Sequence, residues 1–130
     1  MELPAEDQAF VIERGLDYRT SVEANMLCVV FPNYPLPDGC DRSSADLLLR
    51  FTGGYPDVAP DMWWFDPSVR GINGETIQNT ESMEIHLDRT WQRWSRHFEP
   101  GQWKSGIDGL ESFLALINRE LRQSIPKVAV

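Results

Sequence analysis

Residues 46–67 read DLLLRFTGGYPDVAPDMWWFDP. Leu47 to Phe51 and Met62 to Phe65 are short apolar runs bounded by polar and glycine residues, a pattern typical of strands buried on at least one face. Between the runs, two adjacent glycines permit positive φ, while Pro56 and Pro60 fix φ at two points. The stretch therefore predicts two strands joined by a stiff turn, and that turn decides how the strands meet.

Length and composition indicate one globular domain over residues 1–130. The chain is long enough to bury a core without a metal or a disulfide, and its 42% hydrophobic and 25% charged residues are ordinary for a globular protein. The first residues lack the basic, then apolar pattern of a signal peptide, and no apolar run is long enough to cross a bilayer. We therefore expect a cytoplasmic protein without a membrane partner. The net charge of −8 argues against nucleic acid, because phosphate binding needs a basic surface.

The N-terminal half predicts a short helix followed by a hairpin. Glu6 to Arg14 is compatible with a helix that ends at Gly15. Tyr18 to Val22 alternates weakly and Asn25 to Phe31 is apolar and β-branched, so these two runs predict paired strands. Pro32 to Gly39 contains three prolines and an Asp-Gly pair, which we expect to break regular structure. Together with the opening stretch, these runs predict a four-stranded antiparallel meander.

The C-terminal half predicts a long irregular segment and then a packed helix. Ser68 to Ser82 is polar and glycine-bearing, which indicates a long loop, and Met83 to Leu87 indicates a short extended piece. This piece leads into residues 89–103, which we expect to be irregular. Ser105 and Asp108 resemble a capping box, and Pro126 prevents the last helix from extending further. The helix has one predicted buried face, formed by apolar residues at three- and four-residue steps: Ile107, Leu110, Phe113, Leu114, Ile117 and Leu121.

An α+β chain with this order of elements resembles the ubiquitin-conjugating enzyme fold. The resemblance is carried by an apolar strand, Tyr55-Pro56, a few residues, Pro60 and a second strand. Residues 91–97 (WQRWSRH) and 103–108 (WKSGID) add to it, and with them the chain is similar to the bacterial subfamily called E2/UBC family protein E. The resemblance covers nearly all of the chain. It implies a UBC-like fold with a four-stranded antiparallel meander, a long irregular segment and a packed C-terminal helix.

The sequence departs from the catalytic members of that family where their nucleophile is expected. Those enzymes carry a cysteine in a segment that reads roughly Ile-Cys-Leu-Asp, and the comparable stretch here is Ile85-His86-Leu87-Asp88. No cysteine follows Cys40. Carrying an activated ubiquitin-like C-terminus requires a thiolate that holds the acyl group as a thioester. The resemblance therefore implies a protein without the usual cysteine.

Three residues are candidates for a relocated nucleophile. His86 can accept an acyl group, but acyl-imidazoles hydrolyse readily, and the simpler interpretation is a partly exposed loop histidine. Cys28 lies within the apolar run 25–31, where we expect burial as a small hydrophobe. Cys40 lies in a polar loop and is expected to be more accessible, although its acidic neighbours oppose thiolate formation. In an unexported chain we expect both cysteines to be reduced.

Residues 89–97 are the candidate partner-binding site, and the rigid Tyr55–Pro60 turn is the alternative surface. Arginine suits carboxylate recognition and stacking on aromatic faces, so this segment is suited to the C-terminus of a ubiquitin-like protein. The alternatives are core packing for the tryptophans and ion pairs with the chain's own acids for the arginines. His86, His97 and Asp88 lack the spacing of a metal-binding motif, and we expect no metal and no cofactor. The candidate residues are Arg89, Trp91, Arg93, Trp94, Arg96 and His97.

The resemblance also implies a function and partners. We expect a non-catalytic, ubiquitin-conjugating-enzyme-like component of a bacterial ubiquitin-like protein modification system. The implied partners are a ubiquitin-like or multi-ubiquitin-like protein, a ThiF-like adenylating enzyme and a JAB-type peptidase. Two alternatives stay open: an active conjugating enzyme with a relocated nucleophile, and an interaction scaffold unrelated to ubiquitin chemistry.

Overall fold

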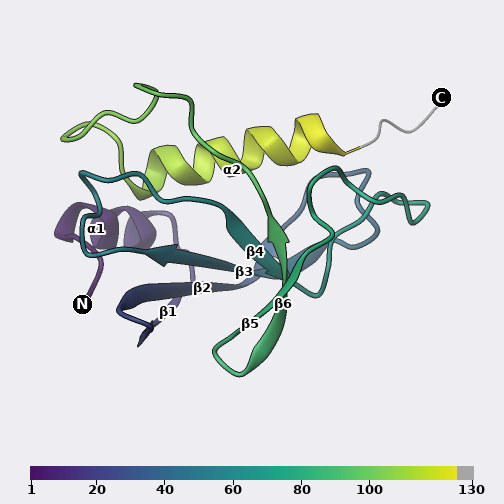
Figure 1. Cartoon of the computed structure of the whole chain (residues 1–130), viewed down its shortest axis with the longest axis horizontal. Helices are drawn as coiled ribbons and strands as arrows, with labels where there is room; N and C mark the ends of the chain where they lie inside the picture. The colour runs from purple at the N-terminus through teal and green to yellow at the C-terminus, as the bar shows by residue number, and fades with distance from the viewer. Residues whose placement is uncertain (126–130) are drawn as a thin grey trace.

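A curled, six-stranded antiparallel sheet forms the body of the protein, and α2 lies across one of its faces (Figure 1). The structure is a computed structural model and describes residues 1–125. The strand order is β1-β2-β3-β4-β6-β5, so the predicted α+β class and four-stranded meander are confirmed and a β5–β6 hairpin extends the meander. The elements are α1 (Ala5–Glu13), β1 (Arg19–Glu23), β2 (Met26–Pro35), β3 (Ser44–Phe51), β4 (Trp63–Asp66), β5 (Met83–His86), β6 (Arg89–Trp94) and α2 (Leu110–Ser124).

The first helix and the first hairpin lie where the sequence predicts them. α1 ends before Gly15, whose φ of 66° suits glycine and whose N–H donates to Ile12 O over 3.1 Å. Ala24 and Asn25 have φ values of 52° and 60° and form the two-residue turn between β1 and β2. Positive φ at both central residues gives a turn whose twist matches that of the flanking strands.

The prediction that residues 32–39 break regular structure is wrong for their first four positions. β2 continues through Pro35, which pairs with Ser44 of β3. The register of β2 on β3 shifts between Phe31 and Tyr34, and this irregularity accommodates Pro32 and Asn33 within the strand. Proline is tolerated at bulges and strand ends, which are the places it occupies here.

The prediction of an irregular segment is wrong for residues 89–94. They form β6, which pairs with β4 on one side and with β5 on the other. Leu87 and Asp88, with φ values of 55° and 58°, make the two-residue turn between β5 and β6. Such turns are usually signalled by Asn-Gly or Asp-Gly, and a Leu-Asp pair does not predict one.

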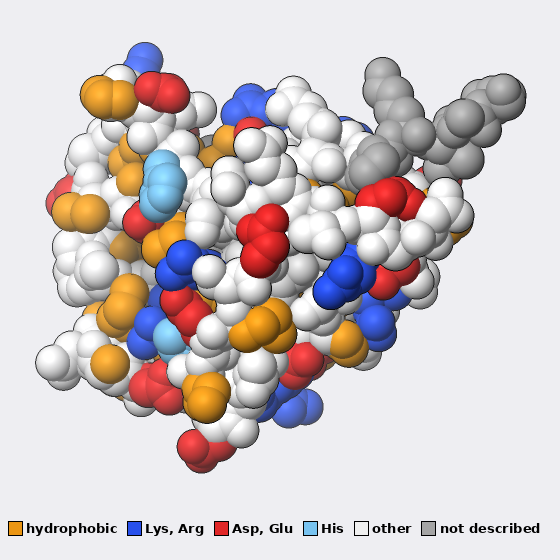
Figure 2. Space-filling view, turned by 45° about the vertical axis from the view of Figure 1, so that its right-hand side comes forward, with side chains coloured by type: hydrophobic (Ala, Val, Ile, Leu, Met, Phe, Trp, Pro, Cys, Tyr) orange, Lys and Arg blue, Asp and Glu red, His pale blue; other side chains and the backbone are white. Residues whose placement is uncertain are grey.

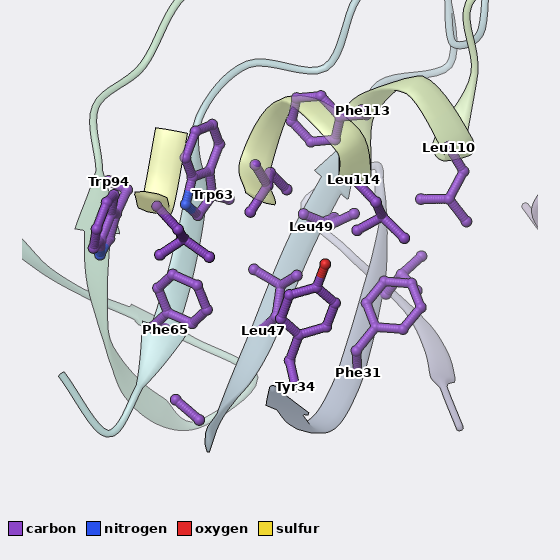
Figure 3. Packing of buried hydrophobic residues seen from close by; sticks show 14 of the residues in the cluster. Phe31, Tyr34, Leu47, Leu49, Trp63, Phe65, Trp94, Leu110, Phe113 and Leu114 are labelled. Carbon is purple, nitrogen blue, oxygen red and sulfur yellow. The ribbon is translucent and has the colours of Figure 1, made fainter. Parts of the chain in front are cut away.

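Two apolar clusters lie on the two faces of the sheet, because successive strand residues point to opposite sides. We call the side covered by α2 the helix face and the other side the outer face. Figure 3 shows the helix face, where Phe113 and Leu114 of α2 pack over strand residues that include Leu49 and Trp63. The outer-face cluster consists of Cys28, Leu48, Trp64 and Trp91.

The predicted buried face of α2 is confirmed except at its start. Ile107 is 79% exposed because α2 begins only at Leu110, so Ile107 lies in the preceding turn. The predicted Ser105–Asp108 capping box is absent from the described structure: Asp108 Oδ2 instead accepts from Lys104 N over 2.7 Å. Pro126 lies outside the described residues. The buried side chains of α2 contribute about 10 kcal/mol to the free energy of folding, before the loss of conformational entropy is subtracted. They are Leu110, Phe113, Leu114, Ile117 and Leu121.

Candidate functional site

The Tyr55–Pro60 turn is hydrogen-bonded to α1 and to the segment that precedes α2. The Tyr55 hydroxyl donates to Asp7 Oδ2 over 2.6 Å, and Trp103 Nε1 donates to the carbonyl oxygen of Pro56 over 2.8 Å. Burial, then the hydrogen bond to Asp7 and its negative charge, raise the pKa of Tyr55 well above its usual value. The hydroxyl therefore remains a proton donor, and the turn is held between α1 and the segment that leads into α2.

Asp7 also caps α2 from the other end of the sequence. Its side chain is buried, and its Oδ1 accepts from Leu110 N, the first residue of α2, over 3.2 Å. A carboxylate is favourable there because helix N-termini carry unpaired N–H groups and a positive partial charge. The N-cap residue, Gly109, has no side chain for this role. Sequence reasoning did not predict Asp7, because 103 residues separate the two partners and no local motif links them.

A groove of about 890 Å³ opens beside the turn. Its walls come from α1, residues 56–57, residues 106–109 and the first half of α2. Ile107 lies at this groove and exposes 79% of its surface. Apolar side chains line it (Phe10, Pro56, Ile107 and Ala115) together with carboxylates (Glu6, Asp7, Asp57, Asp108 and Glu111). The groove is therefore an apolar surface with an acidic rim.

Neither cysteine offers an accessible thiol. Cys28 is fully buried in the outer-face cluster, as expected. The expectation that Cys40 is accessible is wrong, because only 8% of it is exposed. Its backbone bridges to Gly71, and its side chain joins the apolar cluster that contains Val69 and Ile77 of the long loop. Burial, followed by the charge of Asp41, raises the pKa of the Cys40 thiol to about 11.

His86 is held between two carboxylates at the end of β5. Its Nε2 lies 3.1 Å from Glu84 Oε1, its Nδ1 lies 3.5 Å from Glu23 Oε1, and its side chain is 12% exposed. Its ring meets Trp64 edge-on, with centroids 5.3 Å apart. Glu23 also accepts from Leu87 N over 2.8 Å, so it ties β1 to the β5–β6 turn. Because both ring nitrogens face carboxylates, this arrangement suits a structural histidine better than a nucleophile.

Glu84 is the centre of the polar network around His86. It accepts from Trp64 Nε1 over 2.9 Å and from Arg93 Nη1 over 2.7 Å. Burial raises the pKa of Glu84, but the hydrogen bonds with His86 and Trp64 and the charge of Arg93 outweigh burial and leave that pKa below its ordinary value. The network therefore requires an ionised Glu84.

The three arginines of residues 89–97 do not form one patch. Arg89 bonds to Asp46 and Asp66, and its guanidinium lies 4.3 Å from the centre of the Trp91 ring on the outer face. Arg93 also lies on the outer face, where it pairs with Glu84. Arg96 turns to α2 instead, where it pairs with Glu120 at 3.5 Å and donates to Ser124. These are ion pairs with the chain's own acids, one of the two alternatives that the sequence left open.

Trp91 and Trp94 are core residues. Both are fully buried, and their indole N–H groups donate to His86 O and to Gln92 Oε1, each over 2.9 Å. Their burial confirms the core-packing alternative, and neither side chain can contact a partner in this conformation. On the face drawn in Figure 2, Lys and Arg side chains alternate with Asp and Glu side chains and form no broad basic surface.

His97 is the most exposed of the candidate residues. Its Nδ1 lies 2.6 Å from Asp61 Oδ1, and its side chain is 63% exposed. Within residues 1–125, no group of three or more His, Cys, Asp or Glu side chains is placed to hold a metal ion. His86 and His97 therefore belong to separate polar contacts in this part of the chain.

Comparison with known proteins gives one family. The model of prokaryotic E2 family E matches residues 3–124, which is nearly the whole chain. No curated protein and no solved structure matches the sequence. None of the described helices is long and apolar enough to span a membrane. The match agrees with the antiparallel sheet and packed C-terminal helix. The chain therefore belongs to prokaryotic E2 family E, an E2-like family whose role is related to ubiquitin conjugation.

Proposed function

We propose that this protein is a non-catalytic, E2-like component of a ubiquitin-like modification system. It binds the proteins that carry or activate the modifier and forms no thioester itself. The observation that carries the proposal is the state of its two thiols. Cys28 is fully buried, and Cys40 is buried with a pKa raised to about 11. A thioester carrier needs an accessible thiolate, which these environments oppose.

His86 supports the same proposal. It occupies the place where the resemblance puts the catalytic cysteine, yet its ring lies between Glu23 and Glu84 and against Trp64. Acylation of either nitrogen would remove a contact with a carboxylate. In this proposal His86 therefore stabilises the β5–β6 hairpin, and the polar network around it has a structural role.

The proposed partner surface is the groove beside the Tyr55–Pro60 turn. The turn is rigid because Asp7 and Trp103 hold it, so a partner meets a preformed surface. Ile107 and Val58, which are 79% and 54% exposed, provide apolar contacts at and beside the groove. The acidic rim favours a partner that presents Lys or Arg beside an apolar side chain. By contrast, the arginines of residues 89–97 are already paired within the chain.

The proposed partners are a ubiquitin-like or multi-ubiquitin-like protein and a ThiF-like adenylating enzyme, with a JAB-type peptidase as a further member of the same system. Family membership supports these choices, because a conjugating-type protein meets both the activating enzyme and the modifier that this enzyme carries. The acidic, apolar groove is the surface offered to the adenylating enzyme or to the modifier.

Binding measurements with matched exposed isoleucines test this proposal. Titration calorimetry should detect binding of the adenylating enzyme or the modifier encoded beside the gene. Ile107→Asp replaces an exposed apolar side chain of the groove with a carboxylate that would have to lose its water against the partner's apolar side chain. We expect affinity to fall at least about tenfold. Ile12→Asp is the control, because Ile12 is 74% exposed and does not line the groove. It should leave affinity unchanged.

Two results would contradict the proposal. If Ile107→Asp binds normally while Arg93→Ala loses binding, the arginine segment rather than the groove is the partner site. Failure of both partners to bind the wild-type protein would contradict the proposal and favour an interaction scaffold unrelated to ubiquitin chemistry.

A further inference from the structure

β5, the first strand of the β5–β6 hairpin, forms one edge of the sheet. β5 is the last strand in the sheet order and pairs with β6 alone within the described residues. Ser82 immediately precedes β5, and its carbonyl oxygen accepts from Arg93 N of β6 over 2.9 Å, so the backbone groups of Ser82 point toward β6. Inward-pointing and outward-pointing backbone groups alternate along an antiparallel strand, so the N–H and C=O of Met83 and Ile85 point away from β6. These groups are available to another strand.

The side chains along this edge leave it apolar. Met83 is 52% exposed and Ile85 is 74% exposed. The alternate residues, Glu84 and His86, turn to the outer face and bond to each other there. Edge strands are usually protected by charged side chains that stay free at the edge. Here the charged side chains of the strand are engaged in the network beneath it, so they do not protect the edge.

Charges at both ends of β5 indicate what kind of segment fits. Glu81 lies just before the strand and Asp88 lies in the turn after it, and both are exposed. Neither makes a salt bridge within residues 1–125, although the charge of Glu81 acts on Arg96 and opposes the lowering of the Arg96 pKa by burial. An added strand would therefore place its ends beside two exposed carboxylates that no salt bridge in this part of the chain neutralises. Lys or Arg at these ends is favoured by charge complementarity.

We propose that β5 accepts, by strand addition, an extended apolar segment of a partner protein that carries Lys or Arg at both ends. The partner's backbone would pair with Met83 and Ile85, and its basic ends would face Glu81 and Asp88. The edge shares no residue with the groove of the proposed function. The inference is therefore independent of that function, and failure of one leaves the other standing.

The probe is a synthetic peptide, Lys-Thr-Val-Thr-Val-Thr-Lys, added to the isotope-labelled full chain. We expect shifts of the Met83 and Ile85 amide signals and slower hydrogen exchange at both positions. The same peptide with Glu at both ends should bind at least about tenfold more weakly, because it places like charges beside Glu81 and Asp88. A peptide N-methylated along its pairing edge should not bind, because it cannot donate.

Ile85→Pro tests the backbone contact. It removes an N–H that points away from β6, so the β5–β6 ladder keeps its hydrogen bonds while strand addition loses a donor. We expect at least about tenfold weaker peptide binding, whereas Ile85→Thr keeps the N–H and should retain measurable binding. A second variant, Glu81→Gln with Asp88→Asn, tests charge without altering the turn, because asparagine tolerates positive φ. It should lose the preference for the lysine peptide.

Three outcomes would overturn the inference. The lysine peptide could fail to shift any β5 signal at millimolar concentration, or its shifts could map to another element. Ile85→Pro could bind as tightly as the wild type. Finally, concentration-dependent dimerisation that Ile85→Pro abolishes would mean that a second copy, rather than a basic partner segment, occupies the edge.

Discussion

Replacing Asp7 with alanine should destabilise the protein far more than a change at one side chain of a short helix normally does. Asp7 Oδ1 accepts from Leu110 N, a fully buried residue, and Oδ2 accepts from the Tyr55 hydroxyl. Asp7→Ala leaves both donors without these acceptors. A buried unsatisfied donor costs about 1–3 kcal/mol, and loss of a helix cap typically costs about 1 kcal/mol. We therefore expect a loss of about 3 kcal/mol in the free energy of unfolding.

Urea unfolding followed by tryptophan fluorescence measures this loss. For a chain of this size the fall corresponds to a melting temperature lower by about 10 °C. Glu6→Ala is the matched control, because Glu6 is an exposed acid in the first turn of the same helix. It should change stability by less than about 0.5 kcal/mol. An Asp7→Ala protein as stable as the Glu6→Ala protein would refute the capping role.

A double-mutant cycle separates the two contacts. Tyr55→Phe removes only the hydroxyl and should cost about 1–2 kcal/mol. The double variant with Asp7→Ala should cost less than the sum of the two single losses, because each single change removes the same hydrogen bond. Strict additivity would mean that Tyr55 and Asp7 stabilise the protein independently.

Three further predictions concern the buried thiol and the outer face. In the folded protein at neutral pH, Cys40 should react with iodoacetamide at least about 100-fold more slowly than in urea. The reason is that its pKa is raised from 9.0 to about 11, and burial also hinders access of the reagent to the thiol. Equal rates would contradict its buried position. Because the pKa of Glu84 is lowered by folding, its contribution to stability is present above its unfolded pKa and is lost as pH falls through the lower folded value. Glu84→Gln should therefore flatten the acid limb of a stability-against-pH curve, and an unchanged limb would refute this. Arg89→Ala should lower the free energy of unfolding, measured in urea, by only about 1 kcal/mol, because the side chain is 38% exposed. A loss above about 3 kcal/mol would contradict this and show that the ion pairs of Arg89 behave as buried ones.

Local sequence patterns predicted the parts of the fold that depend on local chemistry. The apolar run 47–51, the helical spacing of Leu110 to Leu121 and the glycine after α1 each carry their signal within a few residues. The hairpin turn at Leu87–Asp88 does not, because leucine rarely adopts positive φ and an aspartate by itself is equally common in loops. As a result the strand that follows was predicted as irregular.

The candidate site was harder to predict because its residues meet only in three dimensions. Asp7 reaches α2, and Glu23 of β1 reaches the β5–β6 turn, across long stretches of chain. Cys40 lies in a segment that is polar in sequence, and its burial depends on apolar side chains of a loop about thirty residues later. A polar local sequence therefore did not mean an exposed thiol.

The most direct test of the central claim is intact-mass spectrometry of this protein after incubation with ATP, the adenylating enzyme and the ubiquitin-like protein encoded nearest its gene. The account predicts no mass increase while the adenylating enzyme demonstrably charges itself, together with a stable complex on a sizing column. A mass increase equal to the ubiquitin-like protein that disappears on treatment with reductant would contradict the account. Its loss in a Cys40→Ser variant would then identify Cys40 as a true acyl carrier.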